Sequence, residues 1–329
     1  MSKPRIGFLG TGWIGRHRMQ AIVDTGAVEA VAICDPSPDC VAEAQAIAPG
    51  AAVVPSLQAM LDLGLDGVVI ATPSALHAAQ SLEALGRGVA VFCQKPLGRD
   101  ASEVAAVVDA AQTADRLLGV DLSYRHTAAT EAIAGPIRTG ELGTIFAVDL
   151  TFHNAYGPDK PWFYDRAQSG GGCVIDLGVH LIDLALWLLD FPAVENVTSR
   201  LFSKGQPLAA GADAVEDFAT ARLDLAGGAA VQVACSWNLP AGREAVIEAT
   251  FYGTAGAVTF SNVGGSFYDF AAFRHHGTAA EQIASPPDDW GTRAAAAWAR
   301  QLAGSRSFDP QAARLVDVAQ VLDRIYAGR

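Results

Sequence analysis

The chain has 329 residues, more than one typical domain core accommodates, so we expect two domains. Its 23 basic and 35 acidic residues give a net charge of -12, which argues against a nucleic-acid partner. The five cysteines form no C-x-x-C pair, which argues against a disulfide scaffold and against a thiolate zinc site. This cysteine usage fits a reducing cytoplasm.

Signals for secretion or membrane insertion are not expected in this sequence. Only five residues, Met1 to Arg5, precede the first apolar run, too few for the parts of a signal peptide. The longest apolar stretch, around Leu181 to Leu189, is broken by Asp183 and is too short to span a bilayer. We therefore expect a cytoplasmic protein with no membrane partner.

Residues 1–122 alternate short apolar runs with alanine-rich stretches of helical spacing. Continuous apolar runs are typical of strands buried on both faces, so this alternating pattern predicts a doubly wound parallel sheet covered by helices. The expected strands are Ile6–Leu9, Val28–Cys34, Gly67–Ala71, Val89–Cys93 and Leu117–Asp121, with a shorter one near Val53. The expected helices are Ile14–Asp24, Asp39–Ala48, Ala75–Leu85 and Ala101–Ala114.

After about Leu122 the pattern changes to a helix, Thr127–Thr139, followed by longer strands of alternating polarity. It predicts an α+β domain over residues 123–329 with a large open, mainly antiparallel sheet, and its terminal helices could pack back on the first domain. Gly227-Gly228 predicts a hairpin turn, and Asp309-Pro310 predicts the start of the last helix. The expected strands are Thr144–Phe152, Asp217–Leu225, Ala229–Leu239, Ala245–Tyr252, Ala257–Ser261 and Ser266–Arg274.

A glycine-rich loop lies directly after the first expected strand and opens a helix. It has the spacing G-x-G-x-x-G and consists of Gly10, Thr11, Gly12, Trp13, Ile14 and Gly15. This spacing permits a tight turn and a close approach of the backbone to a pyrophosphate at the helix N-terminus. The second strand ends at Asp35, where a carboxylate can bind a ribose diol and repel a 2′-phosphate, so we expect NAD rather than NADP.

Lys95 is one of only four lysines and follows the strand Val89–Cys93, at the carboxyl edge of the sheet where ligands bind. A second group of polar residues follows the triple glycine at positions 170–172. Asp176, His180 and Asp183 are spaced to share one face of an otherwise apolar helix. Taken alone, His180 could be structural and the Asp-His cluster could suggest a metal. Beside a dinucleotide loop, a histidine suits the proton transfer that accompanies hydride transfer.

The ordered motifs resemble the Gfo/Idh/MocA family of nucleotide-dependent oxidoreductases, which act mainly on sugars and polyols. The similarity covers essentially the full length. The motifs are G-T-G-W-I-G at 10–15, A-T-P at 71–73 with His77, Q-K-P at 94–96, and G-G-G at 170–172 followed by Asp176 and His180.

The resemblance implies a role for each matching residue. Lys95 would contact both the substrate hydroxyl and the nicotinamide side of the cofactor. His180 would be the acid or base, and Asp176 would hold His180 or bind a neighbouring hydroxyl. Thr72, Pro73, His77 and Gln94 would border the cofactor. Position 94 departs from the family, which usually has Glu there, so the carboxylate beside Lys95 is missing.

The resemblance further implies reversible oxidation of a secondary alcohol of a sugar, polyol or sugar derivative by NAD, in a homodimer or homotetramer without a metal. Substrate contacts are expected from the second domain. The candidates are Tyr124, Arg125, His153, Asn154, Trp162 and Trp237. Alternative readings are a keto-sugar or imine reductase, a redox-neutral glycoside-processing relative, a non-catalytic NAD-sensing regulator, and a metal-dependent lyase.

Overall fold

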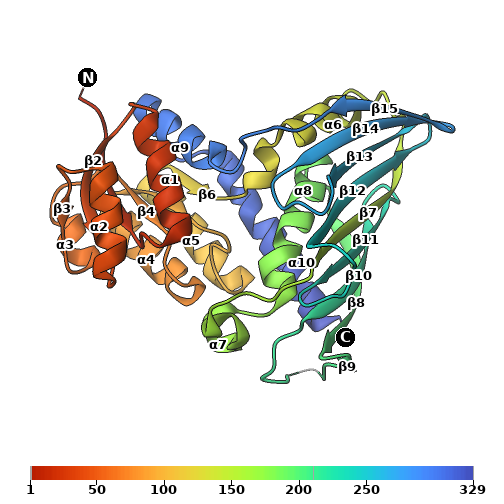
Figure 1. The fold of residues 1–329 in the computed structure, drawn as a ribbon, viewed down its shortest axis with the longest axis horizontal. Coiled ribbons are helices and arrows are strands. Elements are labelled where there is room, and N and C mark those ends of the chain that lie inside the picture. Colours follow the sequence, from red (N-terminus) through yellow and green to blue (C-terminus); the bar gives the residue numbers. More distant parts are fainter. Residues whose placement is uncertain (1, 210, 329) are drawn as a thin grey trace. The chain divides into compact units, whose positions relative to one another are not determined.

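The computed structural model describes residues 2–209 and 211–328. The chain divides into two compact units (Figure 1). The first comprises Met1–Asp121 and Thr292–Val316, and the second comprises Leu122–Gly291 and Asp317–Arg329. A late segment of the chain is therefore part of the N-terminal unit.

The first unit is built on a six-stranded parallel sheet in the order β3-β2-β1-β4-β5-β6. The strands are β1 (Arg5–Leu9), β2 (Glu29–Cys34), β3 (Ala52–Val53), β4 (Gly67–Ile70), β5 (Ala90–Cys93) and β6 (Leu118–Val120). Because β2 and β4 flank β1, the chain winds outward from β1 in both directions, and the strand order reverses there. The prediction of a doubly wound parallel sheet is confirmed.

Helices connect these strands, and serine or aspartate side chains cap three of them. Ser37, Ser56 and Asp100 each accept a backbone N–H in the first turn of the helix that follows. The helices are α1 (Trp13–Asp24), α2 (Pro38–Ile47), α3 (Leu57–Leu61), α4 (Ser74–Gly86), α5 (Ala101–Ala114) and α9 (Arg293–Gly304). The short α3 was not predicted. Trp298 of α9 packs against Phe92 of β5 with ring centroids 5.7 Å apart, which ties the late segment to this core.

The second unit is built on a nine-stranded sheet in the order β15-β14-β13-β12-β7-β11-β10-β8-β9. Among the described strands of this second sheet, only the central pair β7 and β11 is parallel, so the prediction of an open, mainly antiparallel sheet is confirmed. The strands are β7 (Ile145–Asn154), β8 (Val194–Ser203), β9 (Gln206–Pro207), β10 (Phe218–Leu225), β11 (Ala230–Ser236), β12 (Ala245–Gly253), β13 (Ala257–Asn262), β14 (Phe270–His276) and β15 (Ala279–Ala284).

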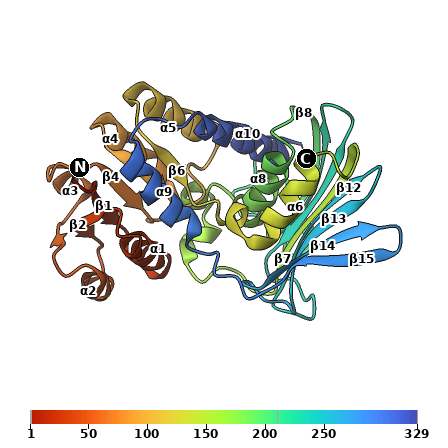
Figure 2. The same ribbon diagram turned by 90° about the horizontal axis from the view of Figure 1, so that it is seen from above.

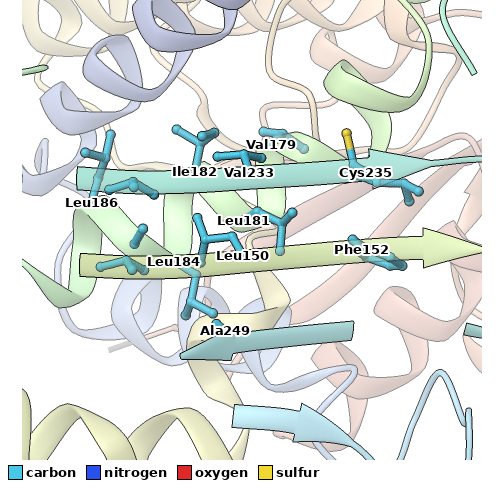
Figure 3. Close-up of a cluster of buried hydrophobic side chains, with 14 of the residues drawn as sticks. Leu150, Phe152, Val179, Leu181, Ile182, Leu184, Leu186, Val233, Cys235 and Ala249 are labelled. Carbon is cyan, nitrogen blue, oxygen red and sulfur yellow. The ribbon is translucent and has the colours of Figure 1, made fainter. Parts of the chain in front are cut away.

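One face of this sheet is covered by helices α6 (Ala128–Arg138) and α8 (Val179–Leu188) (Figure 2). Apolar side chains of α8 interdigitate with inward residues of β7, β11 and β12, including Leu150, Val233 and Ala249 (Figure 3). The last helix, α10 (Arg314–Ala327), adds Leu322 and Ile325 to the same core. This packing fixes the N-terminal end of α8, where the polar residues lie.

The helical segment Arg166–Leu188 is longer than the apolar stretch around Leu181 to Leu189 that the sequence showed. It has 23 residues and a mean hydropathy of 1.6, so length and composition alone would let it cross a membrane. Its most apolar window is 83% buried inside the structure, as in the core helix of a globular domain. One such helix is weak evidence for a membrane span.

Candidate active site

The glycine loop of the first unit leaves the start of α1 open. Gly10 has a φ of +82°, a conformation that favours glycine, and a Cβ on Gly15 would lie 2.1 Å from the Gly10 carbonyl oxygen. No side chain caps the helix, and a Cβ on Gly12 would meet nothing within 4 Å. Exposed backbone N–H groups at a helix N-terminus suit a phosphate, so this loop fits a dinucleotide.

Asp35 is held against this loop by two backbone donors. Its Oδ2 accepts from the Thr11 N–H at 2.6 Å, and its Oδ1 accepts from the Ser37 N–H at 2.9 Å. Asp35 therefore forms the local turn before Pro36 and also faces the dinucleotide loop. Each carboxylate oxygen keeps a further lone pair with which it can accept a ribose hydroxyl.

His77 braces the loops that follow β4 and β5. Its Nδ1 lies 2.7 Å from the Pro96 carbonyl oxygen and its Nε2 lies 2.7 Å from the Thr72 carbonyl oxygen. Burial lowers the pKa of His77, and Lys95 lowers it further, while both carbonyl oxygens oppose the shift. A neutral imidazole donates from one nitrogen only, so the neutral ring can make just one of these two hydrogen bonds.

The Thr72 hydroxyl donates to Gln80 Oε1 at 2.6 Å, while Pro73 lies at the N-cap of α4. The residues predicted to border the cofactor thus lie in the loop after β4, on α4 and just after β5. Trp13 and Ile14 are exposed on the first turn of α1.

Gln94 is bound to a carboxylate that the sequence did not single out. Its Nε2 donates to Asp121 Oδ2 at 2.6 Å, and the same oxygen accepts from Arg18 Nε at 2.6 Å. Asp121 is 1% exposed and follows β6 at the carboxyl edge of the sheet. Asp121 follows β6 as Lys95 follows β5, so its place after an apolar run is a sequence signal that we missed. A carboxylate accompanies the Q-K-P motif after all, at a position distant in sequence.

In the second unit, Asp176 is fixed by an indole. Asp176 lies in a π-helical turn (Val174–Gly178) that leads into α8. Its Oδ2 accepts from Trp237 Nε1 at 3.0 Å, and Trp237 lies just after β11. The wider π-turn changes the spacing that a regular helix would give to the polar residues, and π-turns are frequent at functional sites.

His180 and Asp176 both lie close to Tyr124. The His180 ring packs edge-on to Tyr124 with centroids 4.9 Å apart. Burial, and then the negative charge of Asp176, raise the pKa of Tyr124. Phe270 and Trp290 pack on the same tyrosine. The structure thus brings Asp176 and His180 together around one phenol in an aromatic setting.

Asp183 lies on α8 three residues after His180, as expected for one face of the helix, and it is bound by an arginine. It is buried and forms a two-point ion pair with Arg125, whose Nε donates to Asp183 Oδ2 at 2.8 Å. The guanidinium also lies over the Trp187 ring, 5.6 Å from its centroid. Arg125 is thus held by Asp183 and Trp187. A substrate contact by Arg125 stays a prediction.

The triple glycine is explained by packing. A Cβ on Gly172 would lie 1.9 Å from the Glu216 carbonyl oxygen. Glu216 Oε1 accepts from the N–H groups of Gly172 and Val174 and from the Tyr326 hydroxyl. Burial raises the pKa of Glu216, against the lowering effect of these donors. No local signal in the sequence pointed to Glu216, because its partners are remote along the chain.

His153 and Trp162 take part in aromatic contacts in the second unit. His153 stacks on Phe218 at 5.9 Å, bonds to Ser236 Oγ through Nδ1, and has a pKa lowered by burial. Trp162 stacks on Phe163 at 3.8 Å. Among the described residues there is no group of three or more His, Cys, Asp or Glu side chains that could hold a metal ion.

Two family models, one for each domain, match successive parts of this chain. The family described as "Oxidoreductase family, NAD-binding Rossmann fold" matches residues 4–122, and "GFO/IDH/MocA C-terminal domain" matches residues 131–259. The chain belongs to the Gfo/Idh/MocA family. The resemblance drawn from the motifs is thereby confirmed.

Named relatives and solved structures agree with this assignment. The chain is 30% identical to an inositol 2-dehydrogenase from Streptomyces avermitilis, over 81% of this chain and 77% of that one. It is 31% identical to D-glucoside 3-dehydrogenase from Escherichia coli, over 54% of this chain and 51% of that one. The match spans only about half the length of the first curated relatives. A levoglucosan dehydrogenase in complex with NADH and levoglucosan has the same fold, with a TM-score of 0.83 at 22% identity, covering 99% and 97% of the two chains.

Proposed function

We propose that this protein is an NAD-dependent oxidoreductase that transfers a hydride between nicotinamide and a secondary alcohol or ketone of a sugar, polyol or sugar derivative. The observation that carries the proposal is the carboxylate of Asp176, fixed by the Trp237 indole, beside the His180 ring packed on Tyr124. Asp176 and His180 belong to the second unit, and the first unit supplies the glycine loop and Asp35, which suit NAD. The dehydrogenase names of the family relatives support the sugar or polyol class.

Each proposed residue has one task in this scheme. The His180 imidazole takes the proton from the substrate hydroxyl oxygen as the alcohol is oxidised, and returns it in the reverse direction. Asp176 holds His180 or binds an adjacent hydroxyl, and its own orientation comes from Trp237. Lys95 donates a hydrogen bond to the reacting oxygen, which stabilises negative charge there. Bound NAD supplies the hydride acceptor.

The cofactor preference follows from Asp35. A carboxylate facing the loop accepts ribose hydroxyls and repels a 2′-phosphate, so NAD is preferred to NADP. The residues just after Asp35 include no Arg or Lys that would bind such a phosphate.

We also propose that the protein works in the cytoplasm as a homodimer or homotetramer, with small-molecule partners and without nucleic acid or membrane. Five unpaired cysteines and the net charge of -12 support this setting. Exposed outward residues of the nine-stranded sheet, such as Tyr252 on β12, offer a surface that a second copy could cover.

A substrate panel tests the proposal. Sugars, polyols and sugar acids are offered with NAD and with NADP, and nicotinamide reduction is followed by absorbance. We expect turnover with NAD, and a loss of about 100-fold or more in kcat for His180→Asn. His276→Asn, at an exposed position on β14, is the matched control and keeps full activity. Turnover that is undiminished in His180→Asn would contradict the assigned base.

A further inference from the structure

The second unit contains a cavity of ≈ 780 Å³ at one end of its sheet. It lies where β8 and β11 end and β10 begins. This volume is within the range of about 300 to 1,000 Å³ found for small-molecule sites. Four aromatic rings are part of its lining. They belong to Tyr164, Phe202, Phe218 and Trp237.

The cavity is next to the proposed catalytic carboxylate and separate from it. Among the described residues, its lining includes neither Asp176 nor His180. Trp237 is the shared wall, because its Nε1 donates to Asp176 Oδ2 at 3.0 Å while the residue also lines the cavity. Tyr164 meets the Trp237 ring edge-on, with centroids 5.6 Å apart. An occupant would therefore lie one indole away from Asp176.

The aromatic walls are held in place by their neighbours. The Phe218 ring is stacked on His153, with an interplanar angle of 10°, and meets Phe202 edge-on at 5.9 Å. The Tyr164 hydroxyl donates to the Pro158 carbonyl oxygen at 3.0 Å. A cavity with braced walls loses little conformational entropy when a ligand binds.

Polar groups accompany these rings in the lining. The lining residues include Ser203, Lys204, Asp217 and Asn238, whose side chains carry hydroxyl, ammonium, carboxylate and amide groups. The backbone N–H of Lys204 donates to Asp217 Oδ2 at 2.8 Å, which joins two of these residues. Flat apolar walls with a few polar groups suit a ligand with apolar C–H faces and a rim of hydroxyl groups.

We propose that this cavity is a carbohydrate subsite that takes one pyranose ring beside Trp237. The ring could be the second ring of a glycoside whose first ring is oxidised, or a separate sugar molecule. The glycoside source rests on the proposed function, because it requires that the other ring is oxidised. Binding of a ring in the cavity does not depend on that function.

Calorimetric titration and kinetics on the full-length protein test the proposal together. The probes are cellobiose and maltose as two-ring sugars, and methyl β-D-glucopyranoside as a one-ring sugar. Ala214→Trp fills the cavity from an exposed lining position. Ala226→Trp is the matched control, because Ala226 is exposed at the opposite end of β10 and β11. Phe202→Ala removes one wall and serves as a second variant.

If a linked ring binds, at least one two-ring sugar has a dissociation constant about tenfold or more below that of the methyl glucoside. Ala214→Trp and Phe202→Ala then remove this advantage, and Ala226→Trp keeps it. If a separate sugar binds, the methyl glucoside isotherm shows two sites, and Ala214→Trp loses one. Isotherms that are the same for the wild type and Ala214→Trp overturn the proposal. Loss of binding in Ala214→Trp without any sugar oxidation by the wild type supports the subsite and refutes the proposed function.

Discussion

Replacement of Gln94 by Glu restores the residue usual in the family, yet we predict that it destabilises this protein. The new carboxyl group would lie beside Asp121, where the Gln94 amide now donates at 2.6 Å to a side chain that is 1% exposed. At an effective dielectric constant of about 20, two negative charges at this distance repel by about 6 kcal/mol. Arg18, bound to the same Asp121 oxygen, offsets part of this repulsion.

Proton uptake limits the loss. The introduced carboxyl can remain protonated and donate to Asp121, at a cost of about 1.4 kcal/mol for each pH unit above its ordinary pKa of about 4.3. This gives at most about 4 kcal/mol at pH 7, and with Arg18 nearby we expect a loss of about 2 to 4 kcal/mol. Because the folded-state pKa of the new group is raised, the loss is small near pH 4 and grows as the pH rises.

Urea unfolding of Gln94→Glu at pH 5 and pH 8 measures this effect. Gln20→Glu is the matched control, since Gln20 also donates to an aspartate, Asp24, but on an exposed helix surface. A like-charge pair there costs about 0.5 kcal/mol or less. An equal free energy of unfolding for Gln94→Glu and wild type at pH 8, or a loss independent of pH, would refute the reasoning.

Three further predictions concern the second unit. Glu216→Gln keeps an acceptor for the Gly172 N–H. Because the pKa of Glu216 is raised in the folded state, urea unfolding should show that the variant loses less stability than wild type as the pH rises above about 4.3. The same pH dependence of stability in both proteins would contradict this. Trp237→Phe removes the hydrogen bond to Asp176 and should lower kcat/KM about 10- to 100-fold, whereas full activity would show that the bond is dispensable. Burial raises the pKa of the Cys173 thiol, so Ellman's reagent should leave Cys173 unmodified in the native protein and react with half-buried Cys40. Mass spectrometry of peptides identifies the modified cysteines, and a modified Cys173 in folded protein would argue against this prediction.

The first unit could be predicted well from its sequence because each element is encoded locally. Apolar runs gave the strands, and the glycine loop lies between β1 and α1 as expected. The second sheet was predicted less completely. Strand β8 was missed because Val194–Ser203 places polar residues on its exposed face and few buried residues on the other. Its strand character depends on pairing with β10, which no local pattern reveals.

The candidate site shows the same division between local and distant information. Motif order identified Asp176 and His180, and the structure places both near Tyr124. The π-turn changes the spacing between Asp176 and His180, which regular helical spacing could not predict. The carboxylate of Asp183 is bound by Arg125, a residue remote in the sequence. Partners far apart in sequence, such as Trp237 for Asp176, could only be assigned once the chain was folded.

The central claim is hydride transfer from a sugar or polyol carbon to NAD, and deuterium transfer tests it most directly. The best-oxidised compound of the panel is prepared with deuterium on its carbon-bound positions and incubated with the enzyme and NAD. We predict that the NADH formed carries one deuterium by mass spectrometry, and that His180→Asn forms it far more slowly. NADH without deuterium, or no reduction of NAD by any compound of the panel, would contradict the account.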